Sequence, residues 1–139
     1  MKYLIYLILF LLNNLYAHID QKVLYEFEAK CMICHNTYKK NDTAPPVVAV
    51  QQMYMRNTSN NKDISKQLIA RFLAYPTHKK ALMKPAIELY GLMPQQNLSV
   101  EQIANFAQVI IDTEFEVPDW FDGHYKSHKF KKNNKNNIP

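Results

Sequence analysis

The two cysteines of this 139-residue chain lie three positions apart and are followed at once by a histidine, in the sequence Cys31-Met32-Ile33-Cys34-His35. A C-x-x-C-H stretch is typical of covalent haem attachment. The two thiols, one helical turn apart, can each add to a vinyl group of the porphyrin, and the adjacent imidazole can then bind the iron as its proximal ligand. The rest of the chain would have to supply a second ligand and a dry pocket.

Other kinds of site compete for the same cysteines. A structural disulfide or a thioredoxin-like redox pair would also use C-x-x-C, but here a histidine follows directly and no βαβ pattern surrounds the pair. A zinc site needs four good ligands, and beyond Cys31, Cys34 and His35 nothing in the sequence has the spacing for it. The sequence therefore favours haem over a disulfide or a zinc site.

The N-terminus has the layout of a secretory signal peptide. Met1 and Lys2 form a minimal charged region, an apolar run of ten residues follows from Tyr3 to Leu12, and residue 17 is a small alanine. Ten apolar residues fall short of the roughly 20 that a membrane-spanning helix needs. We therefore expect cleavage after Ala17 and export to the periplasm, with an uncleaved membrane anchor as the alternative. Haem attachment would use both thiols in a compartment where a C-x-x-C pair is otherwise oxidised.

Positive charge is concentrated at the C-terminus. Residues 126–139 contain no acid and five lysines, namely Lys126, Lys129, Lys131, Lys132 and Lys135. Between His18 and Tyr125, 11 Lys and Arg stand against 12 Asp and Glu, so the body of the chain is close to neutral and offers no basic domain to a nucleic acid. We expect the tail to be solvated and disordered, with contact to an anionic membrane surface or an acidic redox partner as the alternative.

The hydrophobic pattern predicts an all-α chain of four or five short helices, because no stretch alternates with period two for long enough to form a strand. The first helix would start at an Asp20 cap and run into the haem motif. A polar loop over 36–43 and the proline pair Pro45-Pro46 follow, and a second helix is expected from about Pro46 to Arg56.

Weaker signals mark the middle of the chain. We expect a third helix to start at an Asp63 cap. Its apolar face would consist of Ile64, Leu68, Phe72 and Tyr75. A fourth segment from Thr77 to Lys84 should break at Pro85, and Gly91 fits a helix end.

The last helix has the strongest local signals. Ser99 and Gln102 form a capping box, and Leu98 and Ile103 occupy the positions of a hydrophobic staple. Apolar residues then repeat at i, i+3, i+4 and i+7, at Ile103, Phe106, Ala107 and Ile110. This pattern predicts a well-formed amphipathic helix.

A candidate for the second iron ligand lies about sixty residues after the haem motif, in Gly91-Leu92-Met93-Pro94. The thioether of Met93 is a soft, neutral donor that raises the reduction potential relative to two histidines and leaves the iron without an open site. A core methionine is the ordinary fate of this residue, and Met53, Met55 and Met83 are competing ligands. Three histidines that lie among lysines are expected to be solvated: His78, His124 and His128.

Taken in order, these features resemble the class I c-type cytochromes, the small monohaem electron carriers of the bacterial periplasm and related compartments. The resemblance covers roughly Val23 to Ile111. It rests on an aromatic-bearing helix that runs into the C-x-x-C-H motif, a proline loop ten residues later, Met93-Pro94, and the helix opened by Leu98-Ser99. Two departures are Asn36, where many relatives have glycine, and a first helix that lacks the glycine that often permits close helix crossing.

The resemblance implies a cytochrome c fold of four to five helices around one haem c. Cys31 and Cys34 would bind the haem covalently, and His35 and Met93 would be the axial ligands of its iron. The carbonyl of Pro45 or a neighbour would accept the Nδ1 proton of His35 and so orient the ring. The first and last helices would cross near two aromatic residues, Phe27 and Phe106.

We therefore expect a cytochrome c domain over 18–125, with a C-terminal extension from about residue 112, between a signal peptide (1–17) and a basic tail (126–139). The expected function is not enzymatic: the protein would carry single electrons between a quinol-oxidising complex and an oxidase or reductase. Two alternatives stay open, a peroxidase-like or gas-binding haem protein with a labile sixth ligand, and a cytochrome subunit tethered by an uncleaved N-terminus. Apolar residues of the extension should pack on the body, with Trp120 as an electron-transfer or docking residue as the alternative.

Overall fold

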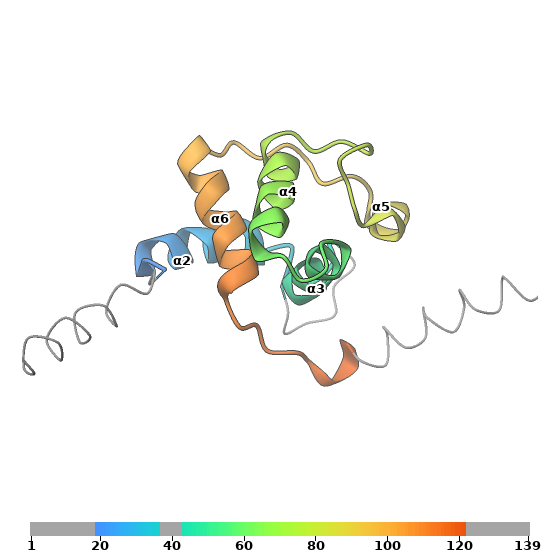
Figure 1. Ribbon diagram of the computed structural model, residues 1–139, viewed down its shortest axis with the longest axis horizontal. Coiled ribbons are helices and arrows are strands. Elements are labelled where there is room, and N and C mark those ends of the chain that lie inside the picture. Colours follow the sequence, from blue (N-terminus) through green and yellow to red (C-terminus); the bar gives the residue numbers. More distant parts are fainter. Residues whose placement is uncertain (1–18, 37–42, 122–139) are drawn as a thin grey trace, which may run out of the picture.

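The computed structural model describes residues 19–36 and 43–121 (Figure 1). In chain order it contains α2 (Gln21–Phe27), the π-helix η1 (Glu28–Met32), α3 (Val47–Asn57), α4 (Lys62–Ala74), α5 (Lys84–Tyr90) and α6 (Val100–Asp112). No strand occurs in these two ranges, so the all-α prediction is confirmed. The expected signal peptide, the lysine tail, most of the 36–43 loop and three histidines, His18, His124 and His128, lie outside the described residues.

The first helix starts where the sequence predicts. The Asp20 side chain accepts a hydrogen bond from the Lys22 amide at 2.9 Å, which satisfies one of the unpaired donors at the helix start. After Phe27 the helix continues as the π-helix η1, which the sequence pattern does not predict. Because π-type bonds span one residue more than α-type bonds, η1 shifts the residues after it around the helix axis. The first two residues of the C-x-x-C-H motif, Cys31 and Met32, belong to this widened turn.

Two predictions for α4 are wrong. The cap is Asn61, whose Oδ1 accepts from the Ile64 amide at 3.0 Å, while Asp63 lies inside the first turn, where its negative charge favours the helix dipole. The inward face is also displaced, since Ile64 is 47% and Tyr75 is 63% exposed. The buried face consists of Ser65, Ile69 and Leu73.

A polar residue on the buried face of α4 explains the second error. The Ser65 hydroxyl is fully buried and pairs with Thr58 Oγ1 at 2.7 Å, so its polar atom is satisfied inside the core. Hydrophobicity alone counts serine as a surface residue and rotates the predicted face by one position. Of the predicted face, Leu68 still packs against the core.

The segment before α5 is a turn, not the predicted helix over Thr77–Lys84. Thr77 caps this turn, with its Oγ1 accepting from the Lys80 amide at 3.3 Å. Pro85 lies in the first turn of α5 and does not break a helix, because proline fits the first turn, where the amide would have no partner. Gly91 ends α5 as predicted, at φ +82°, a conformation that side-chain-bearing residues rarely adopt.

The core forms where α6 crosses α2 and packs along α4 (Figure 1). The predicted capping box is present, with Ser99 Oγ accepting from the Gln102 amide and Gln102 Oε1 accepting from the Ser99 amide, each at 3.1 Å. The rings of Phe27 and Phe106 meet edge to face with centroids 5.6 Å apart, which confirms the predicted crossing point. Around this pair lie Val47, Tyr54, Ile69, Leu73, Ala107, Val109, Ile110 and Ile111.

Truncating Phe106 should be the most damaging single change in this core. Phe106 is fully buried, and Phe106→Ala would remove its contact with Phe27 and leave a cavity, lowering the free energy of unfolding by about 3 to 5 kcal/mol. Urea denaturation followed by circular dichroism measures the change. Val100→Ala, on the same helix but 86% exposed, is the matched control and should change stability by no more than about 0.5 kcal/mol. Equal effects of the two changes would contradict this core.

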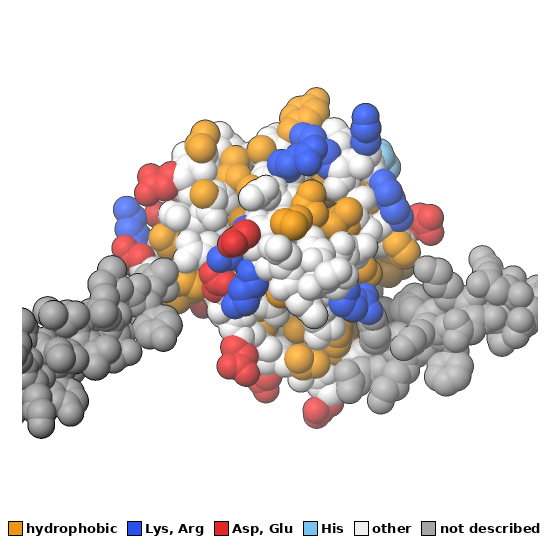
Figure 2. Space-filling model, viewed as in Figure 1, with side chains coloured by type: hydrophobic (Ala, Val, Ile, Leu, Met, Phe, Trp, Pro, Cys, Tyr) orange, Lys and Arg blue, Asp and Glu red, His pale blue; other side chains and the backbone are white. Residues whose placement is uncertain are grey.

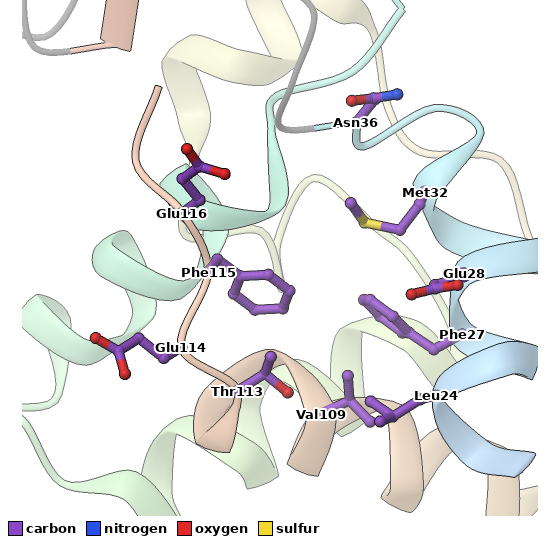
Figure 3. Close-up of a pocket in the computed structure, with 10 residues that line it drawn as sticks. All are labelled: Leu24, Phe27, Glu28, Met32, Asn36, Val109, Thr113, Glu114, Phe115 and Glu116. Carbon is purple, nitrogen blue, oxygen red and sulfur yellow. The ribbon is translucent and has the colours of Figure 1, made fainter. Parts of the chain in front are cut away.

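The segment after α6 packs back on the body, as expected. Phe115 lies against the core, with its ring centroid 6.5 Å from that of Phe27 (Figure 3). Phe121 is 5% exposed. Val117 is the exception at 46% exposed. The Trp120 indole N–H is buried and has no hydrogen-bond partner among the described residues. The extension is therefore part of the same packed body.

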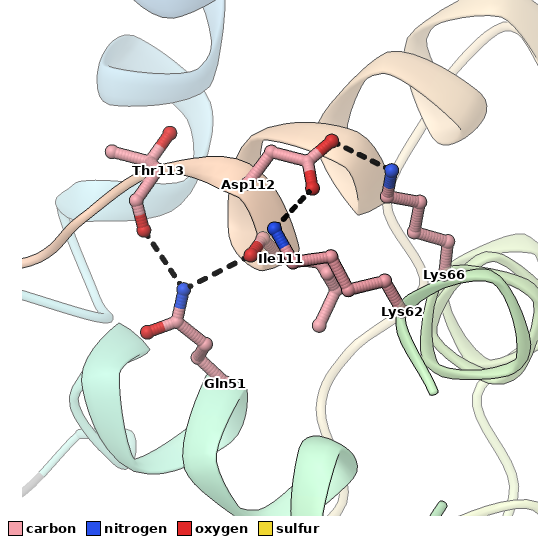
Figure 4. Close-up of polar contacts among 6 residues, drawn as sticks. All are labelled: Gln51, Lys62, Lys66, Ile111, Asp112 and Thr113. Atoms are coloured by element: carbon pink, nitrogen blue, oxygen red, sulfur yellow. Dashed lines mark hydrogen bonds and ion pairs between the residues drawn. The ribbon is translucent and has the colours of Figure 1, made fainter. Parts of the chain in front are cut away.

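Polar side chains from two other helices hold the end of α6 (Figure 4). Gln51 of α3 donates from Nε2 to the carbonyl oxygens of Ile111 and Thr113, at 3.3 and 2.8 Å. The Asp112 carboxylate pairs with Lys62 at 3.3 Å and Lys66 at 2.6 Å, both on α4. Carbonyls at a helix end have no partner inside the helix, so Gln51 supplies one from a neighbouring element.

The ion pairs of Asp112 make stability depend on pH. Burial raises the pKa of this carboxyl, but hydrogen bonds and charge from Lys66 and then Lys62 lower it more, so the net shift is downward. Because the folded-state pKa lies below the unfolded value of about 3.9, the pair stabilises the fold above that pH, and the contribution is lost as pH falls through the folded-state pKa.

Asp112→Asn should therefore lower the free energy of unfolding at neutral pH by up to about 1 kcal/mol, since the groups remain partly exposed to solvent. The difference should shrink as pH falls below the unfolded-state pKa and disappear once the folded-state carboxyl is protonated. Urea titrations at neutral pH and at a series of acidic pH values measure this, with Glu88→Gln, exposed on α5, as the control. A difference that persists unchanged at low pH would rule out the ion pair as its cause.

Charged side chains of both signs are spread over the face seen in Figure 2. Lys and Arg lie along the upper and right edges and also at the left edge, and Asp and Glu lie at the left, right and lower edges. In the same view the upper right holds α5 and the turn before it, and the lower edge holds the segment after α6.

No helix among the described residues is long and apolar enough to span a membrane.

Candidate haem-attachment site

The haem motif forms a tight turn at the end of η1. The amides of Cys34 and His35 both donate to the carbonyl oxygen of Cys31, at 3.2 and 2.9 Å. The two residues between the cysteines point to different sides: Met32 lines a cavity beside the core (Figure 3), and Ile33 is 78% exposed. The turn therefore ends the helix and directs the His35 side chain toward the chain segment before α3.

Two hydrogen bonds join His35 to that segment. Its Nδ1 lies 2.7 Å from the carbonyl oxygen of Pro45, and its own carbonyl accepts from the Val47 amide at 3.0 Å. Pro45 and Pro46 have no amide hydrogen, so Val47 provides the first amide after Ala44 that can donate. The hydrogen bond that the resemblance implied between His35 and Pro45 is present in the structure.

This geometry sets the tautomer of His35. A carbonyl oxygen can only accept, so Nδ1 carries the proton and Nε2 of the neutral ring carries a lone pair. Burial lowers the pKa of His35, and the hydrogen bond to Pro45 only partly offsets this. The ring is therefore neutral at physiological pH, which is the form that binds a metal through Nε2.

The two cysteines are half-buried and do not form a disulfide. Burial raises the pKa of Cys31 to about 11, with the Lys30 charge lowering it and the neighbouring Cys34 raising it. Cys31 is thus a thiol at neutral pH, and it packs against the hydrophobic core. Two thiol sulfurs and the imidazole of His35 therefore lie close together along the chain.

Met93 lies on a separate segment, between α5 and α6, and is half-buried against the core that Cys31 also contacts. Three of the other methionines have different positions. Met53 accepts a hydrogen bond from Arg56, Met83 precedes the first turn of α5, and Met32 lines the cavity in Figure 3. Met55, on α3, and Met32 also pack against the core.

The remaining donors give no competing cluster in the described ranges. His78 is exposed in the turn before α5, and its carbonyl accepts a hydrogen bond from Lys84. No group of three or more His, Cys, Asp and Glu side chains there is arranged to hold a metal ion. A c-type haem takes only two thiols and one or two axial ligands from the chain. Cys31, Cys34 and the Nδ1-protonated His35 fit that requirement.

Sequence reasoning missed two features of this site. Val47 could have been found, because two prolines in a row make the next amide the first available donor. The π-helix η1 could not have been predicted, because Glu28–Met32 contains ordinary helix-forming residues and no local signal separates π from α winding.

Comparisons with protein-family models, with curated proteins and with solved structures gave no match to this chain.

Proposed function

We propose that this protein is a monohaem c-type cytochrome that carries single electrons between redox partner proteins. The observation that supports this most directly is the hydrogen bond from His35 Nδ1 to Pro45 O, which leaves Nε2 of a neutral ring for iron. The motif sequence alone gives two thiols and a histidine. The hydrogen bond adds a fixed ring orientation and the correct tautomer.

In this proposal Cys31 and Cys34 attach the haem. Each thiol adds across one vinyl double bond, so that sulfur bonds to one carbon and the thiol hydrogen goes to the other. No atom leaves and no oxidant is needed, but both sulfurs would have to be reduced. The bound group supplies one-electron exchange between ferric and ferrous iron.

Met93 is the proposed second axial ligand. Pro94 follows Met93 directly and restricts the backbone next to the sulfur. The Met93 side chain is half-buried against the core. A thioether opposite His35 would keep substrates from the iron and favour electron transfer over peroxide or oxygen chemistry. The proposed donors and acceptors are a quinol-oxidising complex and an oxidase or reductase, in the periplasm to which the signal sequence would export the chain.

The test is to produce the full chain together with a haem c attachment system and to purify the exported protein. We expect a mass increase of one haem that survives denaturation. The spectrum of the oxidised protein should contain the weak absorbance band near its red edge that iron bound to methionine sulfur gives. N-terminal sequencing of the same sample reports whether cleavage follows Ala17. A chain that is exported but gains no covalent haem would refute the proposal, and covalent haem without the band would favour the open-site alternative.

A further inference from the structure

Residues 114–121, which we call the strap, follow α6 and are held to the body mainly at their start. Gln51 fixes that start through its two hydrogen bonds to carbonyl oxygens at the end of α6, one of them the carbonyl of Thr113. Beyond Thr113, no hydrogen bond or ion pair joins residues 114–120 to a described residue outside the strap. Within the described part of the chain, apolar contacts alone therefore hold these residues in place.

The apolar contacts under the strap are incomplete. Phe115 packs against Phe27, with ring centroids 6.5 Å apart. A cavity of about 400 Å³ lies between this part of the strap and the helix that leads into the haem motif (Figure 3). In Figure 3 the Phe115 side chain points into the cavity, while those of Glu114 and Glu116 point away from it. Atoms beside unfilled space lack contact partners on that side, so packing stabilises the strap less than it stabilises a filled core.

The closed position of the strap also leaves two buried polar atoms without a partner. Among the described residues these are Thr113 Oγ1, next to the first residue of the strap, and Trp120 Nε1, near its end. A buried polar atom that loses its water and gains no partner bears its full desolvation cost. Water can hydrogen-bond both atoms once the strap lifts. Opening therefore offsets part of the gain from burying Phe115 and Phe121.

We propose that the strap opens as a unit about Thr113 while the helices stay folded, and that opening uncovers the apolar side of the motif helix at Phe27 and Met32. Segments with few hydrogen bonds and few buried contacts open locally at a lower cost than global unfolding. The crossing of α2 and α6 rests on the contact between Phe27 and Phe106, which does not involve the strap. The strap thus acts as a lid over this side of the haem motif.

This inference does not rest on the proposed function. None of the four proposed haem-binding residues lines the cavity under the strap, namely Cys31, Cys34, His35 and Met93. Opening can be measured whether or not haem is attached, so a failure of either proposal leaves the other standing.

Limited proteolysis of the full chain with an endoproteinase that cuts after glutamate measures opening. Glu114 and Glu116 lie in the strap, whereas Glu88 and Glu101 lie in α5 and α6. The first cut is expected in the strap, with the helical body left intact. When opening and closing are faster than cutting, the rate of cutting follows the population of the open strap. Cutting at the helical glutamates at the same rate as in the strap would mean global unfolding and would overturn the proposal.

Variants test what holds the strap closed. Thr113→Val removes the buried hydroxyl and keeps the shape of the side chain, so it should slow the cut after Glu116 by at least about fivefold. Thr113→Ser keeps the hydroxyl and should not slow it. Phe115→Ala removes an anchor and should speed the cut by at least about tenfold, while Val117→Ala, at a residue 46% exposed, should have no effect. Dividing each rate by that of the same variant unfolded in urea corrects for the sequence preference of the protease.

Trp120 is the single tryptophan of the chain, so its fluorescence reports whether the far end of the strap moves with the rest. Acrylamide should quench this fluorescence more strongly in Phe115→Ala than in the wild type, while the circular dichroism of the helices stays the same. An unchanged cutting rate in Thr113→Val would overturn the proposal. Faster cutting in Phe115→Ala without stronger quenching would also overturn it, because the strap would not move as a unit.

Discussion

A variant in which Cys31 and Cys34 are both replaced by alanine is expected to carry no covalently bound haem. The chain has no other cysteine, so no thioether can form. Extraction with acidified acetone should remove all haem from the double variant and none from the wild type, and the intact mass should fall by one haem. Either single variant should keep one thioether bond and an intermediate resistance to extraction.

Ile33→Ala is the matched control for this experiment. Ile33 lies between the two cysteines and is 78% exposed, so its removal changes the motif sequence without changing a sulfur or a packed contact. Attachment should be the same as in the wild type. Covalent haem in the double alanine variant, or its loss in Ile33→Ala, would show that the sulfurs are not the attachment points.

Met93→Ala should remove the band near the red edge of the oxidised spectrum. It should also lower the reduction potential by on the order of 0.1 V, because axial ligands set haem potentials over a wide range and a thioether ligand favours ferrous iron. The change should also open the sixth coordination site, so that cyanide or peroxide gains access to the iron. Spectroscopy and redox titration of the purified protein measure these effects.

Met55→Ala tests the competing assignment. Met55 is the other methionine that packs against the core outside the haem motif, and it comes from α3 instead of the segment before α6. We expect its replacement to lower stability and to leave the band in place. If the band disappears in Met55→Ala and persists in Met93→Ala, the ligand is Met55 and the predicted role of Met93 is wrong.

The starts of α2 and α6 were predictable, because their caps depend on short-range chemistry, whereas the crossing of the first and last helices was implied by the resemblance. Asp20 and the pair Ser99 and Gln102 are recognisable caps, since their side chains bond to amides two or three residues away. The errors in α4 and α5 arose from longer-range effects. The burial of Ser65 depends on Thr58 in the preceding turn, and Pro85 can end or begin a helix according to what surrounds it.

In the candidate site, too, the sequence predicted the contacts within one stretch of chain and did not settle those between distant residues. The C-x-x-C-H motif and the His35 to Pro45 contact were expected from the sequence and its resemblance, since both come from one continuous stretch of chain. The choice among methionines was not settled by the sequence, because spacing does not tell which thioether lies in the core. In the structure, Met93 and Met55 pack against the core, as does Met32 inside the motif, and the ligand itself stays a prediction.

The contact between Phe27 and Phe106 has a consequence for the order of events during synthesis. Chains emerge from the N-terminus, so the cysteine motif leaves the ribosome and would cross a membrane well before α6 does. Until Phe106 arrives, Phe27 lacks its main partner and the helix next to the motif cannot be enclosed. If haem is attached as proposed, this order would leave the segment that carries Cys31 and Cys34 without its packed neighbour until the last helix docks.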